Sequence, residues 1–578
     1  MKTIKRILRR ILLRARGEIL SLTFKGKIIS GVVIVLIIGS LFGAFEIGSS
    51  VRQPEESIPT LGNIPMHLPL PAVPLLTFQQ SLAMNSFPTD QGTLPSRCPA
   101  LPSNWVAFEN SRTSSDVTMK EFKTSHTPWP EGSALWLDKT SVTCGDTVSI
   151  HASSAKFSNG LLSKYPRKFE VIRIGWYGGS GGYVVWKSSP ISLKYFPTPN
   201  PKDNLRTIET KWPVVTSFHI ENSWVPGFYL VASYSSDGYL ESCAPLILRA
   251  PAGAAPLALI HSTLTWNTYN TFGGRSGYIG PGLSHEQMSY ERSRVMSMDR
   301  PLAGSGNELL FRDAVPLVEF AEENGIALSQ YSDVDLNEMP SLLKQYNGIV
   351  FSGHPEYWTQ RNHDAIIAAR NSGINLAFLG GNTSYWRVRL APSPLGPDRH
   401  VIIWRDSRED PAKVQSDATL QYSSSIINQP STLIDGSMTS GLGVYGDLKS
   451  QHLPSWIGVP SGVTLKGFSR YTEIEAPVSG PASPPLVHPL FVGKFTFPGN
   501  PNDQEPRYRN NDVAEMDWFS VPSGAVILNA GVNLWDCNLE PSCGMGTVDW
   551  VTQQNMQIIT SHILQMFAQK GIAQKLLN

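Results

Sequence analysis

The chain has 578 residues, of which 41% are hydrophobic, 10% aromatic and 16% charged, with 48 Gly and 44 Pro. This length exceeds one ordinary core, so two or three domains are expected, and the composition favours strands over long surface helices. Residues 1–27 hold nine Lys or Arg and one acid, which leaves 39 basic and 46 acidic residues in the body. A mildly acidic body is a poor candidate for phosphate-backbone binding, and no nucleic-acid partner is expected.

A run of 18 uncharged residues, Ile28–Phe45, follows the basic segment. As a helix it spans about 27 Å, close to the hydrocarbon thickness of a bilayer. The basic flank predicts a cytoplasmic tail at 1–27, a transmembrane anchor at 28–47 and an extracytoplasmic body, hence a single-pass membrane protein whose partner at Ile28–Phe45 is the lipid bilayer. A cleaved signal peptide is the alternative, although no clear Ala-x-Ala site follows.

A proline-rich segment comes next, with ten prolines between residues 48 and 106. Because proline fixes φ and removes an amide donor, this composition predicts a semi-extended stalk over 48–125. The stretch MHLPLPAVPLL within it is apolar enough to pack on the body.

Strand signals dominate residues 126–252, where short apolar runs alternate with turn residues such as Pro226-Gly227. Six or more strands at this spacing predict an antiparallel β-sandwich. Cysteine positions suggest a closed loop between Cys537 and Cys543, and a bond between Cys144 and Cys243 that would join the first and last strands. Cys98 is then left without a partner.

Strands alternate with helices from residue 253 onward. PLALIHS, IALSQYS, GIVFSG and INLAFLGG read as strands, and helical stretches separate them. This alternation predicts βαβ units and a parallel sheet. The fold class is therefore multidomain α/β plus all-β: an amino-terminal transmembrane helix, the sandwich, and a parallel-sheet domain at 253–578 with a β-rich insertion around 400–520.

Three loops follow strands of the predicted sheet, and ligands bind at the carboxyl ends of such strands. His354 and Glu356 are candidate acid–base groups, and Asn382 is placed to orient a substrate. An ordinary turn opening a helix is the alternative explanation of the HPEYW loop. The expected pocket is lined by polar and aromatic residues from the first and third loops: Trp266, Asn267, Tyr269, Asn270, Tyr385 and Trp386.

Several motifs occur together in a fixed order. These are RIGWYGGSGG (173–182), TWNTYNTFGG (265–274), SDVDL (332–336), GHPEYW (353–358), NLAFLGGNTSYWRVR (375–389) and SGAVILNAG (523–531). In this order they resemble the large (beta) subunit family of N,N-dimethylformamidase over roughly residues 130–570. The resemblance implies a β-sandwich followed by a domain like flavodoxin or class I glutamine amidotransferases, and hydrolysis of amide C–N bonds.

The resemblance also implies a mononuclear iron held by two tyrosines and a glutamate. Tyr357 matches one tyrosine, and Tyr331 is the candidate for the other. Ser431 stands where many relatives have the glutamate, so Glu356 or Asp435 would have to supply the carboxylate. His261 also departs from the residue usual before TWNTYN. Such an iron would polarise an amide carbonyl and activate water.

Two functions follow as hypotheses. The first is an extracytoplasmic, metal-dependent hydrolase that takes a small-molecule amide. The second is a non-catalytic surface protein that binds a glycan or another protein through a degenerate site, and Ser431 favours it. The sequence leaves a homo-oligomer open in both cases.

Overall fold

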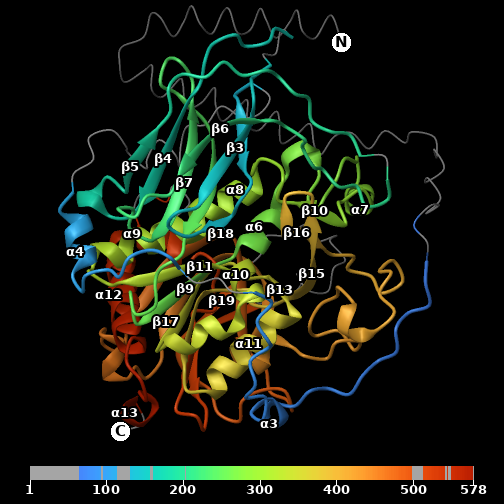
Figure 1. Ribbon diagram of the computed structural model, residues 1–578. Helices are drawn as coiled ribbons and strands as arrows, with labels where there is room; N and C mark the ends of the chain where they lie inside the picture. The colour runs from blue at the N-terminus through green and yellow to red at the C-terminus, as the bar shows by residue number, and fades with distance from the viewer. Residues whose placement is uncertain are drawn as a thin grey trace, which may run out of the picture. The chain divides into compact units, whose positions relative to one another are not determined.

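The computed structural model describes residues 64, 66–92, 96–112, 131–156, 160–201, 203–496, 512–540, 543 and 548–576. Residues Pro65–Asn578 form one compact unit. Its main parts are a β-sandwich, a nine-stranded mixed sheet with helices on both faces, and a small four-stranded sheet (Figure 1). The chain is thus β-rich, with antiparallel and mixed sheets, as its composition predicts.

The sandwich contains two sheets, ordered β1-β3-β6 and β2-β8-β7-β4-β5. Neighbouring strands are antiparallel except for the parallel pair β2 and β8. Inward-facing residues of both sheets form one cluster around Ile150, Val171 and Val231, which holds the sheets face to face. The strands are β1 Ala134–Leu137, β2 Ser141–Val142, β3 Thr147–Ser153, β4 Lys168–Ile174, β5 Gly182–Lys187, β6 Val214–His219, β7 Gly227–Tyr234 and β8 Leu240–Leu248.

The mixed sheet has the order β11-β9-β12-β14-β21-β20-β19-β17-β18. Its first five strands are parallel, in the order found in flavodoxin-like sheets. The predicted insertion continues this sheet with antiparallel strands. The strands are β9 Leu257–His261, β11 Leu328–Ser332, β12 Gly348–Gly353, β14 Asn375–Gly380, β17 Ser437–Ser450, β18 Thr464–Pro477, β19 His488–Phe495, β20 Asp512–Ser520 and β21 Val526–Asn529.

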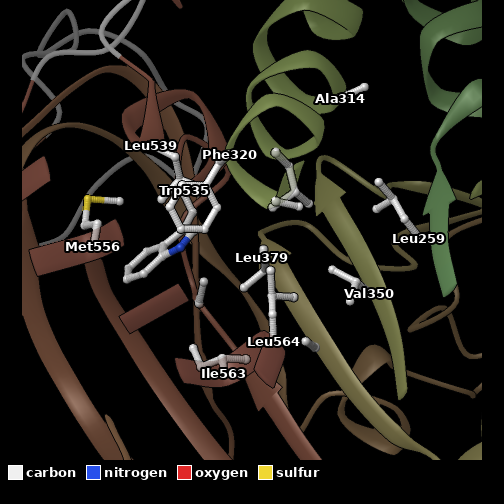
Figure 2. Packing of buried hydrophobic residues seen from close by; sticks show 14 of the residues in the cluster. Leu259, Ala314, Phe320, Val350, Leu379, Trp535, Leu539, Met556, Ile563 and Leu564 are labelled. Atoms are coloured by element: carbon white, nitrogen blue, oxygen red, sulfur yellow. The ribbon is translucent and has the colours of Figure 1, made fainter. Parts of the chain in front are cut away.

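The parallel strands are apolar on both faces, as a sheet covered on both sides requires. Leu259 and Val350 point to one face, where they pack with Phe320 and Leu564 of the covering helices (Figure 2). Their strand neighbours point to the opposite face, which helix α11 covers. The period of two along each strand therefore builds two cores from one sheet.

The helices are short apart from α11 and α12. Side-chain caps begin several of them; the Thr359 hydroxyl, for example, accepts from the Asn362 backbone N–H at the start of α11. The helices are α3 Phe78–Ser81, α4 Trp105–Asn110, α6 Thr263–Tyr269, α7 His285–Tyr290, α8 Ser305–Leu309, α9 Val315–Glu323, α10 Asp333–Glu338, α11 Gln360–Asn371, α12 Trp550–Phe567 and α13 Ala573–Leu576, with a π-helical turn η3 at Leu310–Ala314.

The small sheet has the order β10-β16-β15-β13. Its strand β13 places Tyr357 opposite Trp386 of β15. This sheet therefore joins two of the loops that the sequence marks as functional. The strands are β10 Val295–Ser297, β13 Tyr357–Thr359, β15 Trp386–Ser393 and β16 Gly396–Ile402.

Parts of the proline-rich segment pack on the body. The backbone N–H of Val73 donates to the carbonyl of Ser425, and Phe78 of α3 lies in the core beneath α11. The apolar stretch at 66–76 therefore packs on the body, as its composition indicates, and the bounds predicted for the stalk, 48–125, stay a prediction.

The localisation expected from the sequence also needs correction. In the part of the chain that the structure describes, no helix combines the length and the apolar character needed to cross a bilayer. A single-pass membrane protein is therefore not supported. The predicted tail at 1–27 and the predicted span at Ile28–Phe45 lie outside the described residues.

Two disulfides are present, and one differs from the predicted pairing. Cys537 and Cys543 are bonded, as the sequence predicts. Cys144 is bonded to Cys98 and not to Cys243. The reason is the alternation of side chains along β8: Ala244 points into the sandwich core that contains Cys144, whereas Cys243 points out of it.

A buried ion pair links the sandwich to the mixed-sheet part. Arg173 of β4 donates to both carboxylate oxygens of Glu322 at the end of α9, at 2.6 and 3.1 Å. Tyr177 donates to Glu109 of α4 and accepts from Arg173. Because both charges are out of water, loss of one partner would leave the other charge unpaired.

We predict that Glu322→Gln lowers the free energy of unfolding by about 3 kcal/mol, because it leaves the Arg173 guanidinium buried without a counter-charge. Urea unfolding measures this loss. Lys187→Gln is the control: its ion pair with Glu170 joins two strands of the same sheet at the surface, and its loss should cost below about 1 kcal/mol. Equal losses in both variants would contradict the linking role of Arg173.

Candidate functional site

Three adjacent strands, β9, β12 and β14, end at one edge of the mixed sheet. Gly353 ends β12 and Gly380 ends β14, and a Cβ on Gly380 would stand 1.7 Å from the carbonyl oxygen of Gly353. Only glycine permits this approach. The loops that begin at His354 and Gly381 are consequently held side by side, as the sequence predicts for strand ends of a parallel sheet.

His354 lies between two carboxylates. Its Nε2 is 2.5 Å from Glu473 Oε2 and 3.4 Å from Glu356 Oε2. Its Nδ1 is buried and has no hydrogen-bond partner, and the same is true of Glu356 Oε2. The imidazole is therefore held at one nitrogen, while the other has no acceptor or donor within the protein.

The three groups hold protons differently. Burial raises the pKa of Glu356 to about 7, against the opposing effect of His354. Burial acts in the same direction on Glu473, but the charge and hydrogen bond of His354 outweigh it and lower the pKa of Glu473. Burial disfavours the His354 imidazolium, yet Glu473 and Glu356 outweigh burial and raise its pKa. Two carboxylates that lie beside one imidazole and have pKa values shifted in opposite directions are typical of acid–base sites.

Asn382 orients Glu473. Its Nδ2 donates to Glu473 Oε2 at 2.9 Å, and its Oδ1 accepts from the Thr439 hydroxyl of β17. The backbone of Asn382 has φ of 58°, which is uncommon for a residue other than glycine. Both the Nδ2 and the Oδ1 atom of Asn382 thus form hydrogen bonds within the protein. The side chain therefore supports Glu473, the partner of His354.

Glu475, two residues after Glu473 on β18, holds the other side of this turn. Its carboxylate accepts from the Thr383 backbone N–H at 2.7 Å and from Asn529 Nδ2 at 2.8 Å. Burial raises its pKa to about 7. Alternate residues of a strand face the same side. Strand β18 therefore supplies both Glu473 and Glu475, which accept hydrogen bonds from the turn at Asn382.

Glu473 is the main site residue that the sequence prediction missed. It lies on β18, within the stretch treated as an insertion, and the antiparallel extension of the sheet carries it to His354. The available signal was TEIEAP, where two acids two residues apart interrupt an apolar strand.

Three tyrosines lie close to His354 and to one another. The ring of Tyr269, at the end of α6, lies 5.6 Å from that of His354 and 5.9 Å from that of Tyr357. Tyr278 stacks on Tyr269 at 5.2 Å. Burial raises the pKa of Tyr269 and of Tyr357, and for Tyr357 the neighbouring Arg405 opposes the shift. Three phenol rings thus lie together, and the charge of the buried Glu356 acts on two of them, Tyr269 and Tyr357.

The other predicted pocket residues have structural contacts. Trp266 packs on Phe228 of the sandwich. The amide of Asn270 binds the 301–303 turn. Asn267 Nδ2 donates to the Thr263 carbonyl, and Tyr385 packs edge-on against Trp386.

Tyr331 is not brought together with Tyr357. Its hydroxyl pairs with that of Tyr346 at 2.7 Å, and its ring lies in the core beneath α11, whereas Tyr357 packs in a separate cluster at the small sheet. Ser431 donates to the Ser437 carbonyl. Asp435 accepts from the Ser437 backbone N–H, and burial raises its pKa. The charges of Glu356 and Glu473, in contrast, act on Tyr269 and Tyr357.

Comparison with known proteins agrees with the resemblance read from the motifs. The family described as "N,N-dimethylformamidase beta subunit-like, C-terminal" matches residues 168–547, which is more than half of the chain. The N,N-dimethylformamidase beta subunit of Paracoccus aminophilus is 27% identical over 150 residues, which cover 25% of this chain and 19% of that protein. The alignment thus spans about a fifth of that relative's length.

We predict that Gly380→Ala lowers the free energy of unfolding by at least about 2 kcal/mol, because its methyl group would overlap the Gly353 carbonyl. Gly480→Ala is the matched control, since a Cβ there meets no atom within 4 Å, and we expect a change below about 0.5 kcal/mol. Thermal and urea unfolding compare the two variants. A Gly380→Ala protein as stable as the control would contradict the packing of the two loops.

Proposed function

The chain belongs to the N,N-dimethylformamidase beta subunit-like family, and on that premise we propose that it hydrolyses the C–N bond of a small amide at the His354–Glu356–Glu473 cluster. The observation that carries this proposal is the pairing of His354 with two buried carboxylates whose pKa values shift in opposite directions. Such an arrangement provides a proton acceptor and a stabilising anion in one place.

His354 is the proposed proton carrier. Glu473 holds Nε2, so Nδ1 can take a proton from water as the water oxygen bonds to the amide carbonyl carbon. Glu473 stabilises the resulting imidazolium, and Asn382 keeps that carboxylate in place. His354 then passes the proton to the amide nitrogen as the C–N bond breaks. The products are a carboxylic acid and an amine, and the imidazole returns to its starting state.

The donor set around Glu356 fits the iron that the resemblance implies. Glu356 Oε2 is buried without a hydrogen-bond partner, and the charge of Glu356 acts on both Tyr269 and Tyr357. Phenol and carboxylate oxygens are hard ligands that suit ferric iron. Among the described residues, His, Cys, Asp and Glu alone form no group of three or more able to hold a metal, so the tyrosines are needed. Glu356, Tyr269 and Tyr357 would hold the ion, which would supply Lewis-acid polarisation of the carbonyl.

We predict about one iron per chain in the full-length protein, with loss of iron in Glu356→Gln and in Tyr269→Phe. Elemental analysis measures the metal, and visible absorption from phenolate-to-iron charge transfer reports the tyrosine ligands. Tyr331→Phe is the matched control, because its hydroxyl binds Tyr346, and it should keep both signals. Iron that stays in Glu356→Gln, or is lost in Tyr331→Phe, would contradict the ligand set. Wild-type chain without iron would favour the alternative, a surface binding protein.

A second prediction concerns pH. Neutral His354 is the proton acceptor, and Glu473 raises its pKa, so the acidic limb of the rate profile lies above the ordinary histidine range. Glu473→Gln removes the anion and should move this limb to lower pH. It should also reduce kcat by about 100-fold or more, because the imidazolium loses its partner. An acidic limb that stays in place while the amide is hydrolysed would contradict the assignment.

A further inference from the structure

Arg405 differs from the other arginines of the described structure. Its guanidinium has five N–H donors but gives a single hydrogen bond, from Nη2 to the Tyr357 hydroxyl. Its Nε is buried and has no acceptor. Every other arginine with a described side chain gives at least two hydrogen bonds to protein oxygens.

The surroundings of Arg405 do not neutralise it by direct contact. The guanidinium lies over the rings of Tyr278 and Trp386, at 4.2 and 4.7 Å from their centroids, and forms no ion pair with a described carboxylate. The nearby arginines Arg292 and Arg294 share one acid, Glu409. The charge of Glu356 acts on Arg405 without a direct contact, and unmet donors on a cation cost free energy.

The backbone at Arg405 is also unusual. Seven described residues other than glycine have positive φ, and Arg405, Asn382 and Ser384 are three of them. Two of these residues lie in the turn that holds Glu473, and the third contacts Tyr357. Uncommon conformations of this kind cluster where a side chain must be held for a ligand.

From these observations we infer that Arg405 binds a carboxylate of the substrate, so that the site takes amides that carry a negative charge a few atoms from the scissile bond. Arginine suits a carboxylate because its planar fork can donate two parallel hydrogen bonds. A monoanion fits this place better than a dianionic phosphate, since the negative charge of Glu356 already acts on Arg405. This inference rests on the proposed hydrolysis and names its substrate class.

Two probes that differ only in charge test the inference. N-formylglycine carries the carboxylate, and N-formylglycinamide replaces it with a neutral carboxamide; formate release measures hydrolysis of both. We expect the wild-type kcat/KM to favour N-formylglycine by about 30-fold. Arg405→Gln should remove this preference, so that the ratio of the two kcat/KM values falls to about one. Arg405→Lys, which keeps the positive charge, should retain part of the preference for N-formylglycine.

Arg408→Gln is the matched control, because Arg408 lies three residues later, is largely exposed and pairs with Asp406. It should leave both rates unchanged. An equal loss on both probes in Arg405→Gln would overturn the inference and assign the guanidinium to positioning Tyr357. Equal wild-type rates on both probes would overturn it while the proposed hydrolysis stands.

Binding separates the inference from the proposed function. Calorimetry with N-formylglycine should show binding to the wild type that Arg405→Gln weakens by about 30-fold or more. Such binding without hydrolysis of either probe would support the anion site and contradict the hydrolase. Equal binding to the wild type and to Arg405→Gln would overturn the anion site.

Discussion

The site depends on the contact between Gly353 and Gly380. These residues end neighbouring parallel strands, and their backbones are too close for any side chain between them. The contact brings the loop with His354 and Glu356 against the turn with Asn382. Gly353 has φ of 58°, which glycine adopts readily, and a Cβ there would meet Asp313 at 2.1 Å. Two glycines thus fix the relative position of the proposed reacting groups.

The antiparallel half of the sheet completes the site. Strand β18 supplies Glu473 to His354 and Glu475 to the Asn382 turn, and β17 supplies Thr439 to Asn382. A stretch that looks like an insertion along the chain is therefore an extension of the main sheet in space. The parallel half provides the imidazole, and the antiparallel half provides the anion that sets its pKa.

Local signals predicted much of this arrangement. The alternation of strands and helices marked the parallel sheet, and the ends of its strands marked the loops that carry His354 and Asn382. Contacts between distant segments could not be predicted in this way. Glu473 reaches His354 through the pairing of the seven strands from β12 to β18, and the disulfide of Cys144 depends on which face of β8 Cys243 occupies. Tyr331 directly precedes a family motif in the sequence, but its ring lies in the core beneath α11 and not in the cluster that contains Tyr357.

Amine release from small amides such as N,N-dimethylformamide tests the central claim most directly. The full-length protein should release amine from at least one of a panel of such amides. A His354→Asn protein with the same thermal stability should release amine at a rate lower by about 100-fold or more, because the proton carrier is missing. Equal rates for the two proteins, or no amine from any amide with the wild type, would contradict a hydrolase centred on His354.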